Sequence, residues 1–266
     1  MKKGCLRNNS CTAFTLVELL AVIIILALLS CLLVPAMARA KIKSPAAGCL
    51  SNMRQLMVGW SMYKEENNDS LMPNYTTSVG PVWVPSIEQW SALDGNTNVA
   101  ALLSGVMGSY VQNDVTVFKC PADVVPSVNG QRLRSYSMNG QMGIMRGSPE
   151  SQFNSGYAIY SKGSDLTCPV PSNAFVFCDE WPGSIDDSYL QLQCIVPGYP
   201  NAPAAYMGGA CGFSFADGHG EIHKWQTSTL LQPVVQGVGL NGTTLPSNVH
   251  DVDWLWLRVH ATCKIQ

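Results

Sequence analysis

The most prominent hydrophobic feature of the chain is an unbroken apolar run over residues 14–37. Glu18 is the only charged side chain in this run. A helix rises about 1.5 Å per residue, so the run is long enough to cross a hydrocarbon layer of about 30 Å. Secretory signal peptides have shorter apolar runs, and a small-residue cleavage site occurs only at Ala36-Met37-Ala38. The pattern predicts a transmembrane helix, with a cleaved signal peptide as the alternative.

The next segment, residues 38–68, has the spacing of an amphipathic helix. Its apolar residues recur every three or four positions, at Leu50, Met53, Leu56, Met57, Trp60 and Tyr63. This spacing places them on one helix face, which we expect to pack in a core. Pro45 could kink or interrupt the helix, and the polar run at residues 67–70 is a credible stop.

Beyond residue 70 the helical periodicity is lost, and Gly, Pro, Ser and Asn become frequent. One short helix is expected around Val99–Val111. Short apolar runs bounded by Gly, Pro or Asp predict strands, at Val115–Phe118, Ala174–Cys178, Cys211–Ala216, Glu221–Trp225 and Asp253–Val259. Asp217-Gly218 fits a two-residue hairpin turn, which would place Phe213 opposite Ile222. The expected fold class is α+β, with a long N-terminal helix packed on an antiparallel sheet with long loops.

Composition and charge exclude two classes of protein. Hydrophobic residues make up 47% of the 266 residues, and the net charge is −2, so the chain is not disordered. Residues 69–266 hold eight basic and fifteen acidic side chains, a balance of −7. Binding to nucleic-acid backbones depends on clustered Lys and Arg, so no nucleic-acid partner is expected.

Glu18 is the unusual residue of the apolar run. It lies one helical turn after Phe14. If the chain were cut before Phe14, the new α-amine would lie within reach of this carboxylate, in the same chain or in a neighbouring subunit. The alternative is an interfacial glutamate whose carboxylate extends to lipid headgroups.

The N-terminus resembles that of a known family. A leader with three basic residues precedes the sequence Ala13-Phe14-Thr15-Leu16-Val17-Glu18-Leu19-Leu20. This arrangement is similar to the class III signal of type IV pilins and type II secretion pseudopilins. In that family a prepilin peptidase cuts before the Phe and methylates the new N-terminus. The resemblance implies cleavage between Ala13 and Phe14, although the family usually has Gly where this chain has Ala13. Segments 119–123, 135–140 and 215–219 look like those of large pseudopilin-like proteins.

The resemblance implies a pilin-like organisation. Residues 1–13 would be a leader peptide, 14–37 the transmembrane helix, 38–68 the amphipathic stem helix, and 69–266 a β-rich periplasmic or extracellular head. The protein would be held in the inner membrane with a cytoplasmic leader. It would then assemble with copies of itself and related pilins into a filament, in which Glu18 pairs with a neighbour's N-terminal amine. A secretion pseudopilus and a surface pilus both remain open, as do major and minor subunit roles.

Ten cysteines are present, and seven of them follow residue 37. No C-x-x-C pair occurs, which argues against a zinc knuckle or a thioredoxin-like motif. Some disulfides are expected in an oxidising compartment, but seven is an odd number, so at least one cysteine is free or paired between chains. We predict a Cys49–Cys120 bridge that ties the stem to the head.

Two kinds of metal site are compatible with the sequence. His219, Glu221 and His223 alternate, so a strand would present all three on one face, as in a transition-metal site. A solvated sheet face is the alternative. Acidic loops at Asp179-Glu180, at Asp186-Asp187 and at Asp217 could instead converge on Ca²⁺, or they could simply keep the head soluble.

Enzyme signatures are absent: the chain has no G-x-S-x-G elbow, Walker A loop or dinucleotide-binding turn. We therefore expect a structural protein and not an enzyme. The competing hypothesis is a membrane-tethered module that binds a polysaccharide or another surface ligand and does not polymerise. The tryptophans beyond residue 80 would serve in sugar stacking in this hypothesis, and in core packing otherwise. They are Trp83, Trp90, Trp181, Trp225, Trp254 and Trp256.

Overall fold

The computed structural model describes residues 16–74, 81–85, 88–92, 94–143, 154–238, 243–244 and 250–265. The chain divides into two compact units, Met1–Lys43 and Ser44–Gln266. The predicted leader and its cleavage site, Ala13 and Phe14, lie outside the described residues. The second unit is called the head below.

The long helix α1 runs from Leu16 to Glu66 without an interruption at Pro45. The helix ends at Glu66, just before the polar run at residues 67–70 that predicted its end. Asn68 and Asp69 adopt left-handed backbone conformations, with φ of 54° and 66°, which a continuing helix cannot contain. Glu66 accepts a hydrogen bond from the Tyr110 hydroxyl beside this end.

The predicted membrane localisation is corrected by the structure. Within the described residues, no helix is both long enough and apolar enough to cross a membrane. This finding contradicts the single-pass inner-membrane localisation predicted from residues 14–37.

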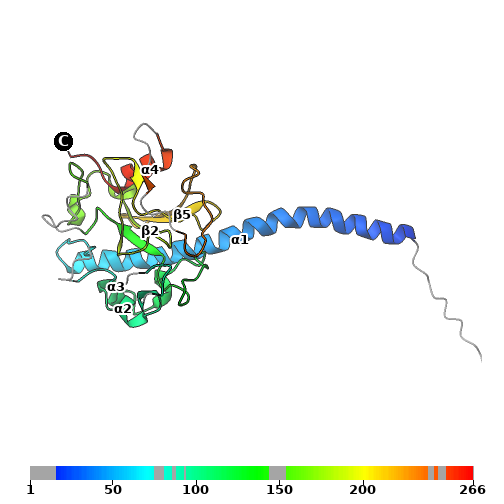
Figure 1. Ribbon diagram of the computed structural model, residues 1–266, viewed down its shortest axis with the longest axis horizontal. Helices are drawn as coiled ribbons and strands as arrows, with labels where there is room; N and C mark the ends of the chain where they lie inside the picture. The colour runs from blue at the N-terminus through cyan, green and yellow to red at the C-terminus, as the bar shows by residue number, and fades with distance from the viewer. Residues whose placement is uncertain are drawn as a thin grey trace, which may run out of the picture. The chain divides into compact units, whose positions relative to one another are not determined.

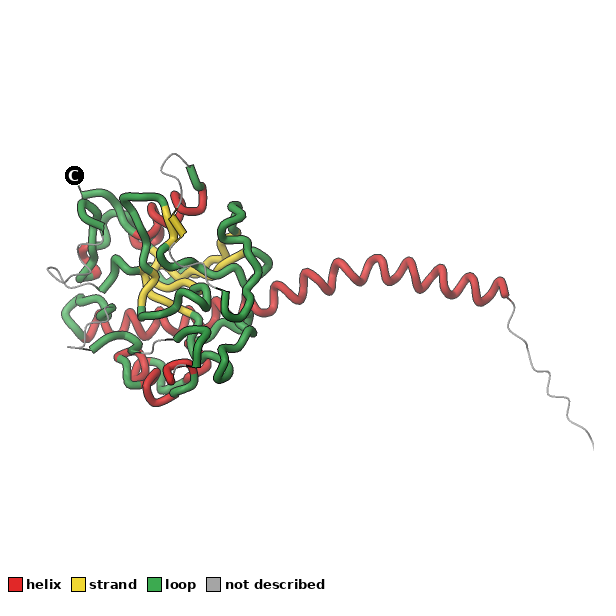
Figure 2. Tube along the Cα trace, in the orientation of Figure 1, coloured by secondary structure: helices red, strands yellow, loops and turns green. Residues whose placement is uncertain are grey.

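The remaining elements are short. The further helices are η1 (Asp94–Asn96), α2 (Val99–Leu103), α3 (Val106–Tyr110), η2 (Val115–Phe118), η4 (Gly163–Asp165), η5 (Pro171–Asn173) and α4 (Val252–Ala261). The strands are β1 (Tyr136–Asn139), β2 (Phe175–Asp179), β3 (Tyr189–Leu190), β4 (Gly198–Tyr199), β5 (Ala210–Phe215), β6 (Gly220–Lys224) and β7 (Thr243–Thr244). Loops connect them over most of the head (Figure 2).

The fold class is α+β, as predicted, but the main sheet is mixed. Its strand order is β3-β1-β2-β5-β6, and β4 pairs with β7 in a separate two-stranded sheet. The expectation of a purely antiparallel sheet is wrong, because β1 and β3 are parallel, with Met138 opposite Tyr189. The other pairs of the main sheet are antiparallel. In Figure 1 the head portion of α1 and the helix α4 lie on opposite sides of this sheet, and α2 and α3 lie beyond α1.

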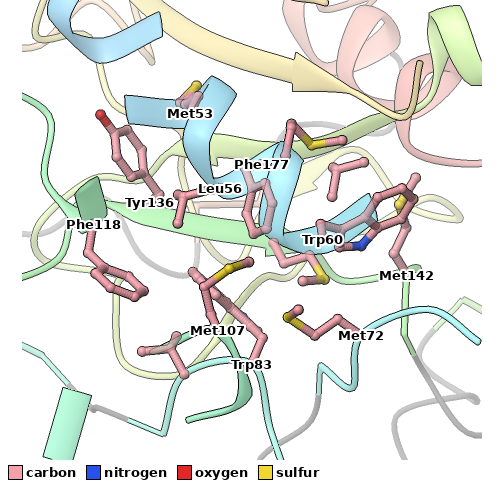
Figure 3. Packing of buried hydrophobic residues seen from close by; sticks show 14 of the residues in the cluster. Met53, Leu56, Trp60, Met72, Trp83, Met107, Phe118, Tyr136, Met142 and Phe177 are labelled. Atoms are coloured by element: carbon pink, nitrogen blue, oxygen red, sulfur yellow. The ribbon is translucent and has the colours of Figure 1, made fainter. Parts of the chain in front are cut away.

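The predicted apolar stripe of α1 forms the centre of the larger core. Met53, Leu56 and Trp60 are fully buried and pack toward Tyr136 of β1 and Phe177 of β2 (Figure 3). Burying a large apolar side chain stabilises a fold by about 1.5–3 kcal/mol. The stripe therefore fixes α1 to the sheet.

The opposite face of the sheet forms a second core with α4. Phe213 and Phe215 of β5 are buried there with Trp254 and Leu257 of α4. The pairing of β2 with β5 shifts between Phe175 and Phe177. A shift of this kind redirects the side chains that follow it. Both faces of the central strands are covered, which explains why their sequences read as continuous apolar runs.

Three predicted elements differ in type or extent. The runs Val115–Phe118 and Asp253–Val259 were expected to be strands, and they are the 3-10 helix η2 and most of the helix α4. An aspartate begins each one: Asp114 accepts from the Thr116 N–H, and Asp251 accepts from the N–H groups of Asp253 and Trp254. The expected helix over 99–111 is divided into α2 and α3 at Gly105, whose extended backbone, with ψ of 164°, cannot continue a helix.

The β5–β6 hairpin has a different register from the predicted one. Phe213 lies opposite Glu221, and Gly212 lies opposite Ile222. The turn has three residues and not two, because the Phe215 N–H donates to the His219 carbonyl, and Gly218 within it has φ of 94°. One extra turn residue shifts the pairing by one and changes which residues share a face.

Candidate assembly surface and buried thiol cluster

The first described part of α1 presents apolar side chains to solvent on every side. Residues 16–30 are all exposed. The large apolar ones are between 43% and 81% exposed: Leu16, Val17, Leu19, Leu20, Val22, Ile23, Ile24, Ile25, Leu26, Leu28 and Leu29. Monomeric soluble proteins rarely expose contiguous apolar surface of this kind, and such surfaces mark interaction sites. A helix that is apolar all round is normally covered on all sides.

Glu18 is the only charged residue among these exposed positions. It occupies the first turn of α1, where a carboxylate is favoured by the positive end of the helix dipole. The residue that the sequence marked as an assembly determinant therefore lies on the exposed apolar surface. Phe14, one turn before it in the sequence, lies outside the described residues.

A second feature is a fully buried cluster of two thiols and a carboxylate in the head. Cys49 of α1, Cys120 after η2 and Asp179 at the end of β2 have no exposed surface. One ligand atom from each lies within 4.8 Å of the other two. The Cys49 thiol donates to Asp179 Oδ2 at 3.1 Å, and the Gly212 N–H donates to the same oxygen at 3.0 Å.

Two glycines allow the backbones around this cluster to approach closely. A Cβ at Gly48 would lie 2.9 Å from Cγ of Pro121, the residue after Cys120. A Cβ at Gly212 would lie 2.9 Å from Cys49 Sγ and 3.1 Å from Asp179 Oδ2. A larger residue at Gly48 would push α1 away from the segment that carries Cys120. A larger residue at Gly212 would push Cys49 of α1 away from Asp179.

The electrostatics of the cluster are dominated by burial. Burial raises the pKa of Asp179 to about 7, against the effect of the hydrogen bonds from Cys49 and from the Gly212 N–H. Burial also raises the pKa of the Cys49 thiol well above its usual value. Both groups therefore favour their neutral forms. A neutral thiol beside a carboxylate is an unreactive arrangement until a proton is removed.

The other predicted metal ligands are not brought together. In the described part of the chain, only Cys49, Cys120 and Asp179 form a group of three or more potential ligands. Asp179 thus groups with two cysteines and not with Asp217, His219, Glu221 or His223. Glu180, the residue that follows β2, is buried and accepts a hydrogen bond from the Ser184 hydroxyl.

The histidines of the β5–β6 hairpin pack against aromatic rings. His219 pairs with Asp217 at 2.6 Å across the turn and stacks on Phe215. His223 stacks on Trp256 of α4, with ring centroids 3.8 Å apart. Burial lowers the pKa of His223. These contacts make the histidine face part of the interface between the hairpin and α4.

Most tryptophans beyond residue 80 pack in the interior and are not on the surface. Five of the six that follow residue 80 are buried, and Trp256 is partly exposed. Trp83 donates a hydrogen bond to the Ser188 carbonyl, and Trp225 donates to the Ala204 carbonyl. A buried indole cannot stack on a sugar, so these residues give no support to the polysaccharide-binding hypothesis.

A buried ion pair was not foreseen from the sequence. Arg132 and Asp123 have no exposed side-chain surface and lie 2.7 Å apart. Asp123 also accepts a hydrogen bond from Ser135. Asp123 lies in the segment 119–123 that resembled pseudopilin-like proteins, so only the resemblance singled it out. This pair anchors the loop that follows Cys120.

Comparisons with known proteins give no relative from which a role could be transferred: no family model, curated protein or solved structure matches the chain.

Proposed function

We propose that the chain is a structural subunit of a helical filament of the type IV pilus or type II secretion pseudopilus kind. The observation that carries this proposal is the exposed, all-round apolar surface of α1 over residues 16–30. In a filament, copies of this helix would cover one another. The resulting burial of apolar surface would supply the free energy of assembly, at about 25 cal/mol per Å².

The head has the features of a subunit body. Its sheet is covered on one face by the second part of α1 and on the other by α4. We also propose that this arrangement of helix and sheet is pilin-like. It is supported by the N-terminal resemblance and by the packing of the α1 stripe against the sheet.

Glu18 would set the register between subunits. A carboxylate buried among apolar helices is strongly unfavourable unless it is paired. A prepilin peptidase that cleaves between Ala13 and Phe14 would create a cationic α-amine one turn away, and the amine of a neighbouring subunit could pair with Glu18. Only one axial offset between two helices would then satisfy both charges.

The test is filament formation by a Glu18→Ala variant in the source cells. Sheared surface and periplasmic fractions would be examined by electron microscopy, with mass spectrometry for this chain. We expect filaments containing the chain from the wild type. The filament yield should fall at least about tenfold for Glu18→Ala, in line with the cost of an unmatched buried amine.

Glu65→Ala, which removes an exposed glutamate of the same helix, is the matched control. Equal filament yield from all three would contradict the register role, and no filament from the wild type would contradict the proposed function.

A further inference from the structure

We propose that Cys49 and Cys120 close into a disulfide that covalently joins helix α1 to the head. The geometry of the thiol cluster carries this inference, and it stands independently of filament assembly. The Sγ atoms lie within 4.8 Å of each other. A disulfide requires about 2.05 Å, so a modest rotation of the side chains toward each other closes the gap.

The surroundings bring the two cysteines together from distant parts of the chain. Cys49 is on the buried face of α1, and Cys120 lies 71 residues later, two residues after the end of η2. The contact of Gly48 with Pro121 brings the two backbones close. Asn52 of α1 reinforces this contact, because its amide donates to the carbonyls of Thr116 and Lys119. The cysteines are therefore held in place by packing and hydrogen bonds on both sides.

The composition of the cluster favours a disulfide over a metal ion. A structural zinc site has four protein ligands, which are cysteines together with at most two histidines. The described residues supply two thiols and one carboxylate here, and Asp179 Oδ2 already accepts the Gly212 N–H. Two thiols alone satisfy the requirements of a cross-link.

The chemistry is exchange with a disulfide-containing oxidant, RS–SR. Cys120 as its thiolate attacks RS–SR, forms a mixed disulfide and releases RS⁻. Cys49 as its thiolate then attacks Cys120 Sγ, which forms the Cys49–Cys120 bond and releases the second RS⁻. The two thiol protons end on the two released RSH molecules. Two electrons pass from the cysteines to the oxidant, which is reduced to 2 RSH.

Burial sets the order of folding and oxidation. Both sulfurs are inaccessible in the folded head, so the first exchange takes place before α1 has packed on the sheet. The second brings α1 into its native position. The finished bond is shielded from reductants by the core, as expected for a structural disulfide.

The direct test is peptide mapping of the full chain, refolded in a buffer of reduced and oxidised glutathione and alkylated under denaturing conditions. Trypsin places each cysteine in its own peptide, residues 44–54 and residues 120–132. We expect one linked species of these two peptides that separates after reduction. Recovery of both peptides in alkylated form would overturn the proposal. So would a stoichiometric bound zinc ion released on thiol modification.

Thermal unfolding gives a second readout that does not depend on digestion. Refolding the wild type with a reductant should lower its Tm on the order of 10 °C, because the bond closes a loop of about 70 residues. The Cys49→Ala/Cys120→Ala double variant should lack this reductant-dependent shift. Cys178→Ala, which removes a buried thiol from the other face of the sheet, should retain it. A shift in the double variant equal to that of the wild type would contradict the proposal.

Discussion

Asp179, Glu88 and Glu180 are carboxylates with no exposed surface. Burial raises the pKa of Glu88 and of Asp179 to about 7, and the pKa of Glu180 well above its ordinary value. A raised pKa in the folded state means that the folded protein binds more protons than the unfolded chain between the two pKa values. Stability then falls as pH rises through that window. These residues are positions at which the head is sensitive to pH.

The first residue-scale prediction concerns the pH dependence of unfolding. The head should be more stable at pH 5 than at pH 7.5, because Glu88 and Asp179, each with a pKa of about 7 in the fold, are largely neutral at pH 5 and ionise as the pH rises past 7. The raised pKa of Glu180 acts in the same direction. His223 acts in the opposite direction, since burial lowers its pKa. Asp187, whose pKa burial raises to about 7, acts in the same direction as the three acids. Thermal melts of the full chain at both pH values measure the difference.

Asp179→Asn isolates one contribution to this effect. The amide cannot ionise and its oxygen can still accept the Gly212 N–H, so the difference in Tm between pH 5 and pH 7.5 should shrink. Glu65→Gln, at an exposed position, should leave it as in the wild type. A larger pH dependence in Asp179→Asn would show that the carboxylate stays ionised in the fold.

At the scale of single elements, the apolar pattern identified α1 well because its stripe is long and regular. Five short apolar runs were predicted as strands, and two of them are helical. A short apolar run fits either a strand or a buried helix. In both helical cases the deciding signal was an aspartate at the N-cap, Asp114 or Asp251. The register of the hairpin could not be fixed from the pattern, since two- and three-residue turns both accept Asp-Gly.

The candidate sites also differ in how far the sequence predicted them. The exposed apolar helix and Glu18 were visible in the sequence because they depend on consecutive residues. The pairing of Asp179 with the cysteines was not, because it depends on the β2–β5 register, which shifts near Phe177. Of the three alternating residues, Glu221 and His223 lie on β6 and His219 precedes the strand. His223 stacks on Trp256 of α4, and nothing in the hairpin sequence indicates that contact.

Gly59 provides a prediction for the contact between α1 and α3. It lies within the apolar stripe, and a Cβ there would lie 2.8 Å from Met107 Sδ and 3.0 Å from Tyr110 Cβ. A side chain at this position would push α3 away from α1. We expect Gly59→Leu to destabilise the head by about 2 kcal/mol through overpacking, despite the better helix propensity of Leu. Chemical denaturation measures the change.

The neighbouring residue supplies the control for this element. Val58 is 55% exposed on the same helix, so Val58→Leu should change the free energy of unfolding by less than about 0.5 kcal/mol. If Gly59→Leu proves as stable as the wild type, α3 adapts its position, and the close approach at Gly59 is not needed for folding.

For the whole molecule, both hydrophobic cores consist of residues within the unit Ser44–Gln266. Residues 16–30, the part of the other unit whose side chains are described, contribute nothing to either core, and their large apolar side chains are exposed. Stability and association should therefore reside in different parts of the chain. A substitution in one unit should leave the property of the other unchanged.

A truncated chain that begins at Ser44 tests this separation. It should remain monomeric and unfold cooperatively, because both cores are intact, whereas the full chain should self-associate through the apolar surface of α1. Size-exclusion chromatography with light scattering measures association, and thermal melts measure folding.

A full-length variant with Leu20→Lys and Ile24→Lys places two charges one turn apart on the exposed helix. It should keep the melting behaviour of the full chain and lose association. If the truncated chain associates as strongly as the full chain, the assembly surface lies on the head, and the exposed helix does not drive assembly.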